Sequence, residues 1–151
     1  MKTAPALAPP APPAEPPTSY RLTVPNGATA PGVARDLVAA LLRSTGHPQL
    51  VEAARLCTSE AMTNVHRHAP RTRLVHVEVS VGSKGVTVCV VDDEPHLLPE
   101  PQERFTDQER GLGLYLICTC SDAWGVTLRG GLIAKTKSVW FRLDEGGRGV
   151  A

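Results

Sequence analysis

The sequence predicts a two-layer α/β sandwich, in which one mixed sheet is covered on one face by about three helices. Short segments rich in β-branched residues indicate strands, and longer segments with apolar residues three or four positions apart indicate helices. Along the 151 residues, these segments follow the order β-α-α-β-β-loop-α-β-β. A chain of this length is sufficient for one domain with a substantial core.

Turn-forming residues set the boundaries of the expected elements. Pro31 suits the first turn of a helix, Gly46 ends that helix, and Gly82 and Gly85 divide a hairpin. Residues 93–110 contain three prolines and many charges, which predicts a long irregular loop of functional importance. The expected strands are 19–24, 74–81, 86–92, 125–130 and 137–144, and the expected helices are 30–45, 48–68 and 111–124.

The composition of the two ends indicates where the domain begins and ends. Residues 1–18 combine proline with small residues and are expected to form a disordered tail, because such a segment cannot bury a core. The folded domain is expected to span residues 19–144. Residues 145–151 are glycine-rich and are expected to be frayed.

The charge and hydropathy of the chain exclude several classes of function. With 16 basic and 15 acidic residues, the net charge is +1, so no direct binding to nucleic acid is expected. The longest apolar segments fall short of a membrane span, and no secretory signal is recognisable. The four cysteines have neither redox nor zinc spacing. We therefore expect a cytoplasmic protein without membrane contact.

A polar stripe runs along the second predicted helix. Glu60, Asn64 and His68 recur at intervals of four, which places them on one slowly drifting face. Apolar residues such as Ala61 and Val65 flank this stripe, so it borders the core rather than lying opposite it. A solvated helix face would account for the pattern, but a carboxylate, an amide and an imidazole beside a core indicate a binding site.

Two further segments have features of a ligand site. Asp92 ends a predicted strand at the start of the long loop, and Gly111-Leu112-Gly113-Leu114 opens the third helix. The amides and dipole of a helix N-terminus favour phosphate. Each feature alone is also typical of a turn or a cap.

The order and spacing of these segments resemble the ATP-binding domain shared by gyrase and histidine kinases, which has the Bergerat fold. The matching motifs are the N box Glu60-Ala61-Met62-Thr63-Asn64, the strand-end Asp92, a lid over residues 93–110, the glycine box at Gly111 and a final strand with Ser138. The segments SEAMTNVHRHA, ERGLGLYLI, SDAWGV and KSVWFRL are similar to small actinobacterial anti-sigma-factor serine kinases. This resemblance covers about residues 20–143.

The resemblance implies ATP and Mg²⁺ as cofactors and assigns roles to the motif residues. Asn64 is expected to ligate Mg²⁺, since its amide oxygen can join phosphate oxygens around the ion. Glu60 is expected to accept the proton of an attacking hydroxyl. The expected contacts of the remaining residues are adenine for Asp92 and Ser138, phosphates for Gly111, Gly113 and Leu114, the γ-phosphate for Arg110, and either ATP or a structural hydrogen bond for His68.

The chain also departs from the family pattern. After Asp92 the superfamily has D-x-G-x-G, whereas this chain continues Asp93-Glu94-Pro95 and lacks the glycine that lets backbone and adenine approach closely. Two functions therefore remain open. One is a serine kinase that acts on an anti-sigma-factor antagonist and sequesters a sigma factor. The other is a non-catalytic module that regulates by protein contact alone. A homodimer is compatible with either function, whereas the proline-rich tail excludes a histidine kinase's phospho-accepting helices.

Overall fold

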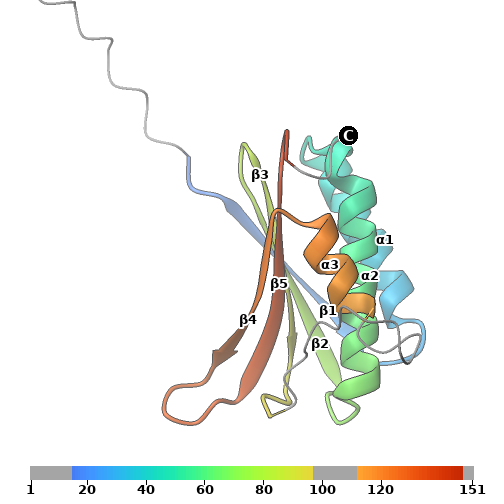
Figure 1. Ribbon diagram of the computed structural model, residues 1–151, viewed down its shortest axis with the longest axis vertical. Helices are drawn as coiled ribbons and strands as arrows, with labels where there is room; N and C mark the ends of the chain where they lie inside the picture. The colour runs from blue at the N-terminus through green and yellow to red at the C-terminus, as the bar shows by residue number, and fades with distance from the viewer. Residues whose placement is uncertain (1–14, 97–111, 148–151) are drawn as a thin grey trace, which may run out of the picture.

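The computed structural model describes residues 15–96 and 112–147, with the side chains of residues 112 and 113 excepted. A five-stranded sheet forms one layer, and three helices cover one of its faces (Figure 1). The helices are α1 (Ala30–Ser44), α2 (Val51–His68) and α3 (Leu112–Cys120). α2 packs against both α1 and α3, so it is the central helix. The predicted two-layer α/β fold is confirmed.

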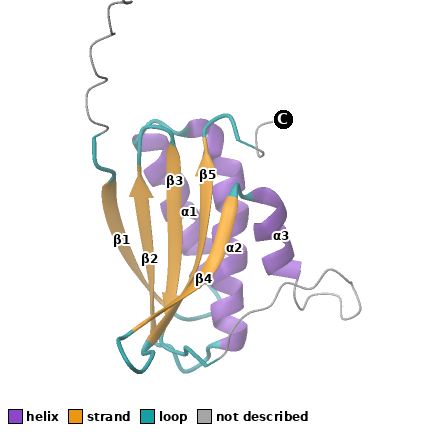
Figure 2. Cartoon of the chain, turned by 60° about the vertical axis from the view of Figure 1, so that its left-hand side comes forward, coloured by secondary structure: helices purple, strands orange, loops and turns teal. Residues whose placement is uncertain are grey.

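The sheet contains five strands in the spatial order β1-β2-β3-β5-β4 (Figure 2). The sequence predicted a mixed sheet, but all neighbouring strand pairs are antiparallel. β3 and β4 run in the same direction, as their connection through one helix favours, but β5 lies between them and is antiparallel to both. The strands are β1 (Thr18–Pro25), β2 (Leu74–Val81), β3 (Gly85–Asp92), β4 (Ala123–Arg129) and β5 (Thr136–Asp144).

Alternation within the strands builds the core between the two layers. Every second residue of β2, β3 and β5 is buried against the helices, because successive side chains of a strand point to opposite faces. These residues are Val75, Val77, Val79, Val86, Val88, Val90, Val139, Phe141 and Leu143. The helices contribute Ala34, Val38, Leu42, Ala54, Ala61, Met62, Val65, Leu114 and Ile117.

Two helix boundaries differ from the sequence prediction. A 3₁₀ turn, Pro48–Leu50, precedes α2, so the α-helical part begins at Val51. α3 ends at Cys120 instead of continuing to residue 124. There the Ser121 hydroxyl donates a hydrogen bond to the carbonyl of Ile117 (2.6 Å), and the next amide already pairs with β5. Formation of β4 therefore ends the helix.

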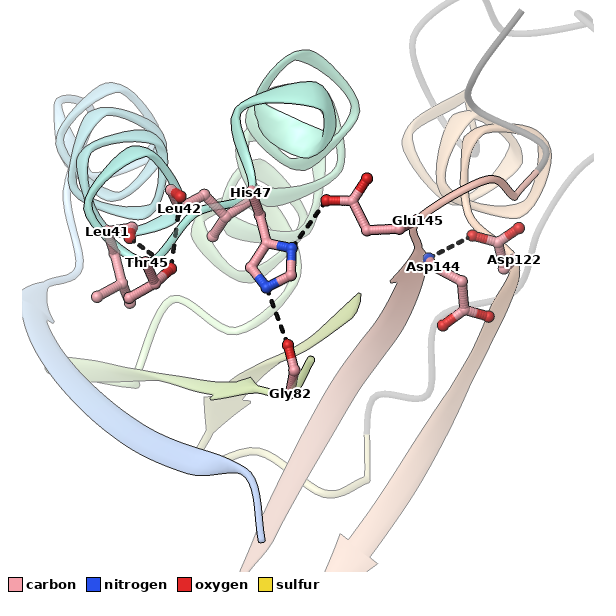
Figure 3. A network of polar contacts seen from close by, with 8 residues as sticks. All are labelled: Leu41, Leu42, Thr45, His47, Gly82, Asp122, Asp144 and Glu145. Atoms are coloured by element: carbon pink, nitrogen blue, oxygen red, sulfur yellow. Dashed lines mark hydrogen bonds and ion pairs between the residues drawn. The ribbon is translucent and has the colours of Figure 1, made fainter. Parts of the chain in front are cut away.

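A polar network around His47 closes the end of the sheet formed by the β2–β3 turn (Figure 3). His47 is buried, and its Nδ1 and Nε2 lie 2.8 Å from Glu145 Oε1 and 2.9 Å from the carbonyl oxygen of Gly82. The Glu145 amide also donates to the carbonyl of Lys84 (2.7 Å). Glu145 was expected in the frayed end, but it is held in place by two other segments.

Across the described parts of the chain, no helix combines the length and the apolar character needed to span a bilayer.

Candidate functional site

The C-terminal end of α2 and the end of β3 meet at one end of the sheet, opposite the His47 network. β2 begins shortly after α2, and its first residues pair with the last residues of β3. Two hydrogen bonds join the connecting segments: the Asp93 amide donates to Thr72 Oγ1 (2.9 Å), and the Arg71 amide donates to Glu94 Oε1 (3.1 Å). The structure therefore brings the C-terminal end of the polar stripe of α2 to the same end of the sheet as Asp92.

The stripe on α2 borders the core, as its spacing predicts. Glu60 and Asn64 are half-buried, and His68 is exposed at the last residue of the helix. Burial raises the pKa of the Glu60 carboxyl, while nearby Arg67 acts in the opposite direction. A half-buried carboxyl with a raised pKa is suited to accepting a proton from a bound hydroxyl.

α3 directs its N-terminus toward this same end. The helix leads into β4, whose first residue, Ala123, pairs with Arg142 at the other end of the sheet, so the first turn of α3 must lie back toward Asp92. Gly113 lies in this first turn, whereas the side chain of Leu114 is buried in the core. The predicted phosphate contacts of Gly111 and Arg110 fall outside the described residues.

Asp92 forms a buried ion pair with Lys137. The two residues face each other across β3 and β5, and Lys137 Nζ lies 3.4 Å from Asp92 Oδ2. Their side chains are 2% and 4% exposed, so the pair is shielded from water. Asp92 Oδ1 accepts a hydrogen bond from the Glu94 amide (2.8 Å). Burial raises the pKa of Asp92, and the Glu94 amide and the Lys137 ammonium partly counteract this effect.

Ser138 does not lie beside Asp92. Its register partner on β3 is Val91, and side chains alternate along a strand, so Ser138 projects from the opposite face of the sheet. Its hydroxyl is buried without a hydrogen-bond partner in the described structure. Lys137 takes the position where Ser138 was expected. The signal was present in the sequence, since counting back by two from the core residue Val139 gives Lys137.

A pocket of about 580 Å³ opens at this end of the sheet, and neither Asp92 nor Lys137 is among the residues that line it. Three segments line it: Pro70 and Arg71 after α2, residues 93–96 after β3, and Ala134 with Lys135 between β4 and β5. Glu94 contributes a buried Oε2 without a partner among the described residues. The pocket therefore combines apolar surface with charges of both signs at the end of the sheet that holds the other polar groups.

The described residues contain no group of three His, Cys, Asp or Glu side chains arranged to hold a metal ion. Burial, with smaller contributions from Cys120 and Glu60, raises the pKa of the Cys57 thiol to about 12, so this thiol is protonated near neutral pH.

Mg²⁺ commonly retains waters and shares phosphate oxygens with few protein ligands. The amide oxygen of Asn64, which is half-buried on α2, is of a kind that can take part in such shared coordination.

In this two-layer α/β fold, the C-terminal end of the central helix and the end of β3 bring polar groups to one end of the sheet, an arrangement typical of a ligand-binding domain. Residues 25–137 match the histidine kinase-like ATPase domain, and the chain belongs to this family. ATP is the ligand that this membership implies. No curated protein is similar enough to the chain to count as a relative.

Proposed function

We propose that this protein is a regulatory serine kinase that uses Mg-ATP to phosphorylate an anti-sigma-factor antagonist and sequesters a sigma factor. The observation that carries the proposal is that Glu60 and Asn64 are half-buried on α2, the helix whose C-terminal end adjoins the end of β3 at Asp92. Membership of the ATPase family and the resemblance of the motifs to anti-sigma-factor kinases support the same assignment.

Each residue has a role that its surroundings suit. The Asn64 amide oxygen joins phosphate oxygens around Mg²⁺, and the metal supplies neutralisation of phosphate charge when it is bound. Glu60 accepts the proton of the antagonist's serine hydroxyl, a task that its raised pKa favours. Asp92, whose carboxylate is buried and fixed by the Glu94 amide, accepts a hydrogen bond from the adenine amino group.

A second candidate is a module that binds protein partners without catalysis. The observation in its favour is the state of Asp92, both of whose carboxylate oxygens already have partners in the Glu94 amide and Lys137. The segment after Asp92 also lacks the family's glycine. In this case a sigma factor or its antagonist is bound by surface contact alone.

Titration calorimetry with Mg-ATP and Mg-ADP separates the two candidates. The kinase requires sub-millimolar binding, and Asn64→Ala should weaken that binding far more than it lowers the melting temperature. Gln49→Ala, at an exposed position in the preceding 3₁₀ turn, is the matched control and should bind as the wild type does. Absence of binding in the wild-type protein would favour the non-catalytic module.

Phosphotransfer to a candidate antagonist tests the catalytic step. General-base assistance is worth about 10²–10⁴-fold in rate. Glu60→Gln should therefore retain ATP binding and lose most of the transfer of radiolabelled phosphate. Glu52→Gln removes an exposed carboxylate from the first turn of the same helix and serves as the control. Equal transfer by Glu60→Gln and the wild-type protein would remove Glu60 from catalysis.

A further inference from the structure

The side chain of Glu94 borders the pocket with one carboxylate oxygen that has no partner. Glu94 Oε1 accepts a hydrogen bond from the Arg71 amide (3.1 Å), and the Glu94 amide donates to Asp92 Oδ1 (2.8 Å). Both the backbone and the carboxyl group of Glu94 are therefore held in place. Glu94 Oε2 is buried and has no hydrogen-bond partner within the described structure, although the residue lines a pocket of about 580 Å³.

An unpaired, buried carboxylate oxygen is costly, because it has lost water without gaining another donor. Arg71 and Lys135 also line the pocket, and both are exposed. Among the described residues, neither of these cations pairs with Glu94 Oε2. A donor that enters the pocket from outside offsets the cost, and a charged donor does so most effectively.

The remaining walls of the pocket fit the aliphatic part of a basic side chain. Pro70, Pro95 and Ala134 provide apolar surface beside the carboxylate. Lysine and arginine combine an aliphatic stem with a charged head, so they complement a pocket with apolar walls and an unpaired acceptor. The volume lies in the range of ligand-binding pockets.

The β4–β5 connection presents exposed aliphatic side chains next to the pocket. Leu132 is fully exposed and Ile133 is 75% exposed, and the two residues that follow them, Ala134 and Lys135, line the pocket. This connection, the turn after α2 and the end of β3 lie together at the lower end of the molecule in Figure 1. Neighbouring aliphatic side chains exposed in this way are typical of contact surfaces for proteins. A free amine fills only the pocket, whereas a polypeptide also covers these side chains.

We propose that the pocket binds a basic side chain of a protein partner. Glu94 Oε2 accepts a hydrogen bond from the charged head, and Leu132 and Ile133 pack against apolar residues that flank the basic residue in the partner. Glu94 occupies a position where the D-x-G-x-G pattern has glycine, so the site belongs to this chain rather than to the whole superfamily. The inference goes beyond the proposed function, because it requires neither ATP binding nor phosphotransfer.

Two small probes test the pocket itself. Acetyl-arginine methylamide carries the guanidinium, and acetyl-citrulline methylamide replaces it with an uncharged urea of nearly the same shape. In ¹H–¹⁵N NMR spectra of the full chain, the arginine probe should cause saturable shifts centred on the amides of Arg71, Glu94 and Lys135. The citrulline probe should bind about tenfold to a hundredfold more weakly, which is the usual contribution of a hydrogen bond between charged groups.

Glu94→Gln assigns the preference for a cation to this carboxylate. The glutamine oxygen still accepts from the Arg71 amide, but its amide nitrogen presents a donor where Oε2 was an acceptor. The variant should therefore bind the two probes equally weakly. Glu52→Gln removes an exposed carboxylate from the first turn of α2 and should keep the preference for arginine.

A peptide tests whether the occupant is a polypeptide. Acetyl-Ala-Leu-Arg-Leu-Ala-amide places leucines on both sides of the arginine and should bind more tightly than acetyl-arginine methylamide. Burial of about half of one aliphatic side chain corresponds to about fivefold in affinity. Leu132→Ser should therefore weaken peptide binding by about fivefold and leave the binding of acetyl-arginine methylamide unchanged. Because Leu132 is fully exposed, this substitution does not disturb the core.

Each possible result supports or overturns the inference. Absence of saturable shifts with the arginine probe, or equal binding of the citrulline probe, would overturn the site, since water would then be sufficient for Glu94 Oε2. If the peptide bound no more tightly than the single residue and Leu132→Ser had no effect, a free cation would be the ligand and the protein partner would be overturned. A chain that binds no ATP would contradict the proposed kinase but not this site, so the two failures are distinguishable.

Discussion

Substitution of Lys137 by methionine should destabilise the fold strongly. Methionine fills a similar volume, but it leaves Asp92 2% exposed and without its cation. Removing one partner of a buried ion pair typically costs about 3–5 kcal/mol. This is a large fraction of the roughly 5–15 kcal/mol by which small proteins are stable. In the variant, the Glu94 amide can still donate a hydrogen bond to one carboxylate oxygen of Asp92, which limits the loss of stability.

Urea denaturation measures this cost. With an m-value of about 1–3 kcal/mol/M, the midpoint should fall by about 2 M at neutral pH. Adding Asp92→Asn should restore most of the loss, because an uncharged residue no longer needs the ammonium. Glu78→Gln, which breaks the exposed Arg129–Glu78 pair (2.9 Å), should cost less than about 1 kcal/mol.

The coupling energy between the substitutions of Lys137 and Asp92 tests whether the lost ion pair causes the destabilisation. A coupling energy below about 0.5 kcal/mol between Lys137→Met and Asp92→Asn would refute the reasoning, because residues in direct contact should not be additive. The pH dependence gives an independent check. Without Lys137, burial of Asp92 is less compensated and its pKa should rise further. The stability of the variant should then be lost as pH rises through that higher pKa, and its deficit should shrink in acid.

Three other changes test packing, electrostatics and the polar network. Gly85→Ala presses a Cβ against the backbone of β5 and should lower the free energy of unfolding by about 1–3 kcal/mol. The Cβ added by Gly27→Ala meets no atom within 4 Å, so that variant should stay within about 0.5 kcal/mol of the wild type. Equal urea midpoints for the two variants would contradict this. Because burial raises the pKa of Glu60 above 4.5, the wild type should lose stability as pH rises through the raised pKa, and Glu60→Gln should not. Parallel pH profiles of stability for the wild type and Glu60→Gln would contradict a raised pKa of Glu60. His47→Ala should cost about 1–3 kcal/mol of unfolding free energy, since two partly buried oxygens lose their partner and a buried ring is removed. An unchanged melting temperature would show that the network is dispensable.

The layers and most elements followed from the sequence because alternation and helical spacing report burial directly. The strand order did not follow. The sequence shows that β3 and β4 are joined through a helix, but only the packed sheet shows that β5 enters between them. The stripe of Glu60 and Asn64 was predictable from spacing on one helix. The partner of Asp92 required a cross-strand register, and there a shift of one residue exchanges Ser138 for Lys137.

β5 comes last in the chain but lies between β3 and β4 in the sheet. During synthesis, β3 and β4 therefore wait with unpaired edges until residues 136–144 emerge, and edges of this kind readily pair with other chains. Pairing that depends on residues distant in sequence also slows folding. The same insertion brings Lys137 to Asp92. A chain truncated before residue 136 therefore lacks both the strand that joins β3 to β4 and the cation that pairs with Asp92.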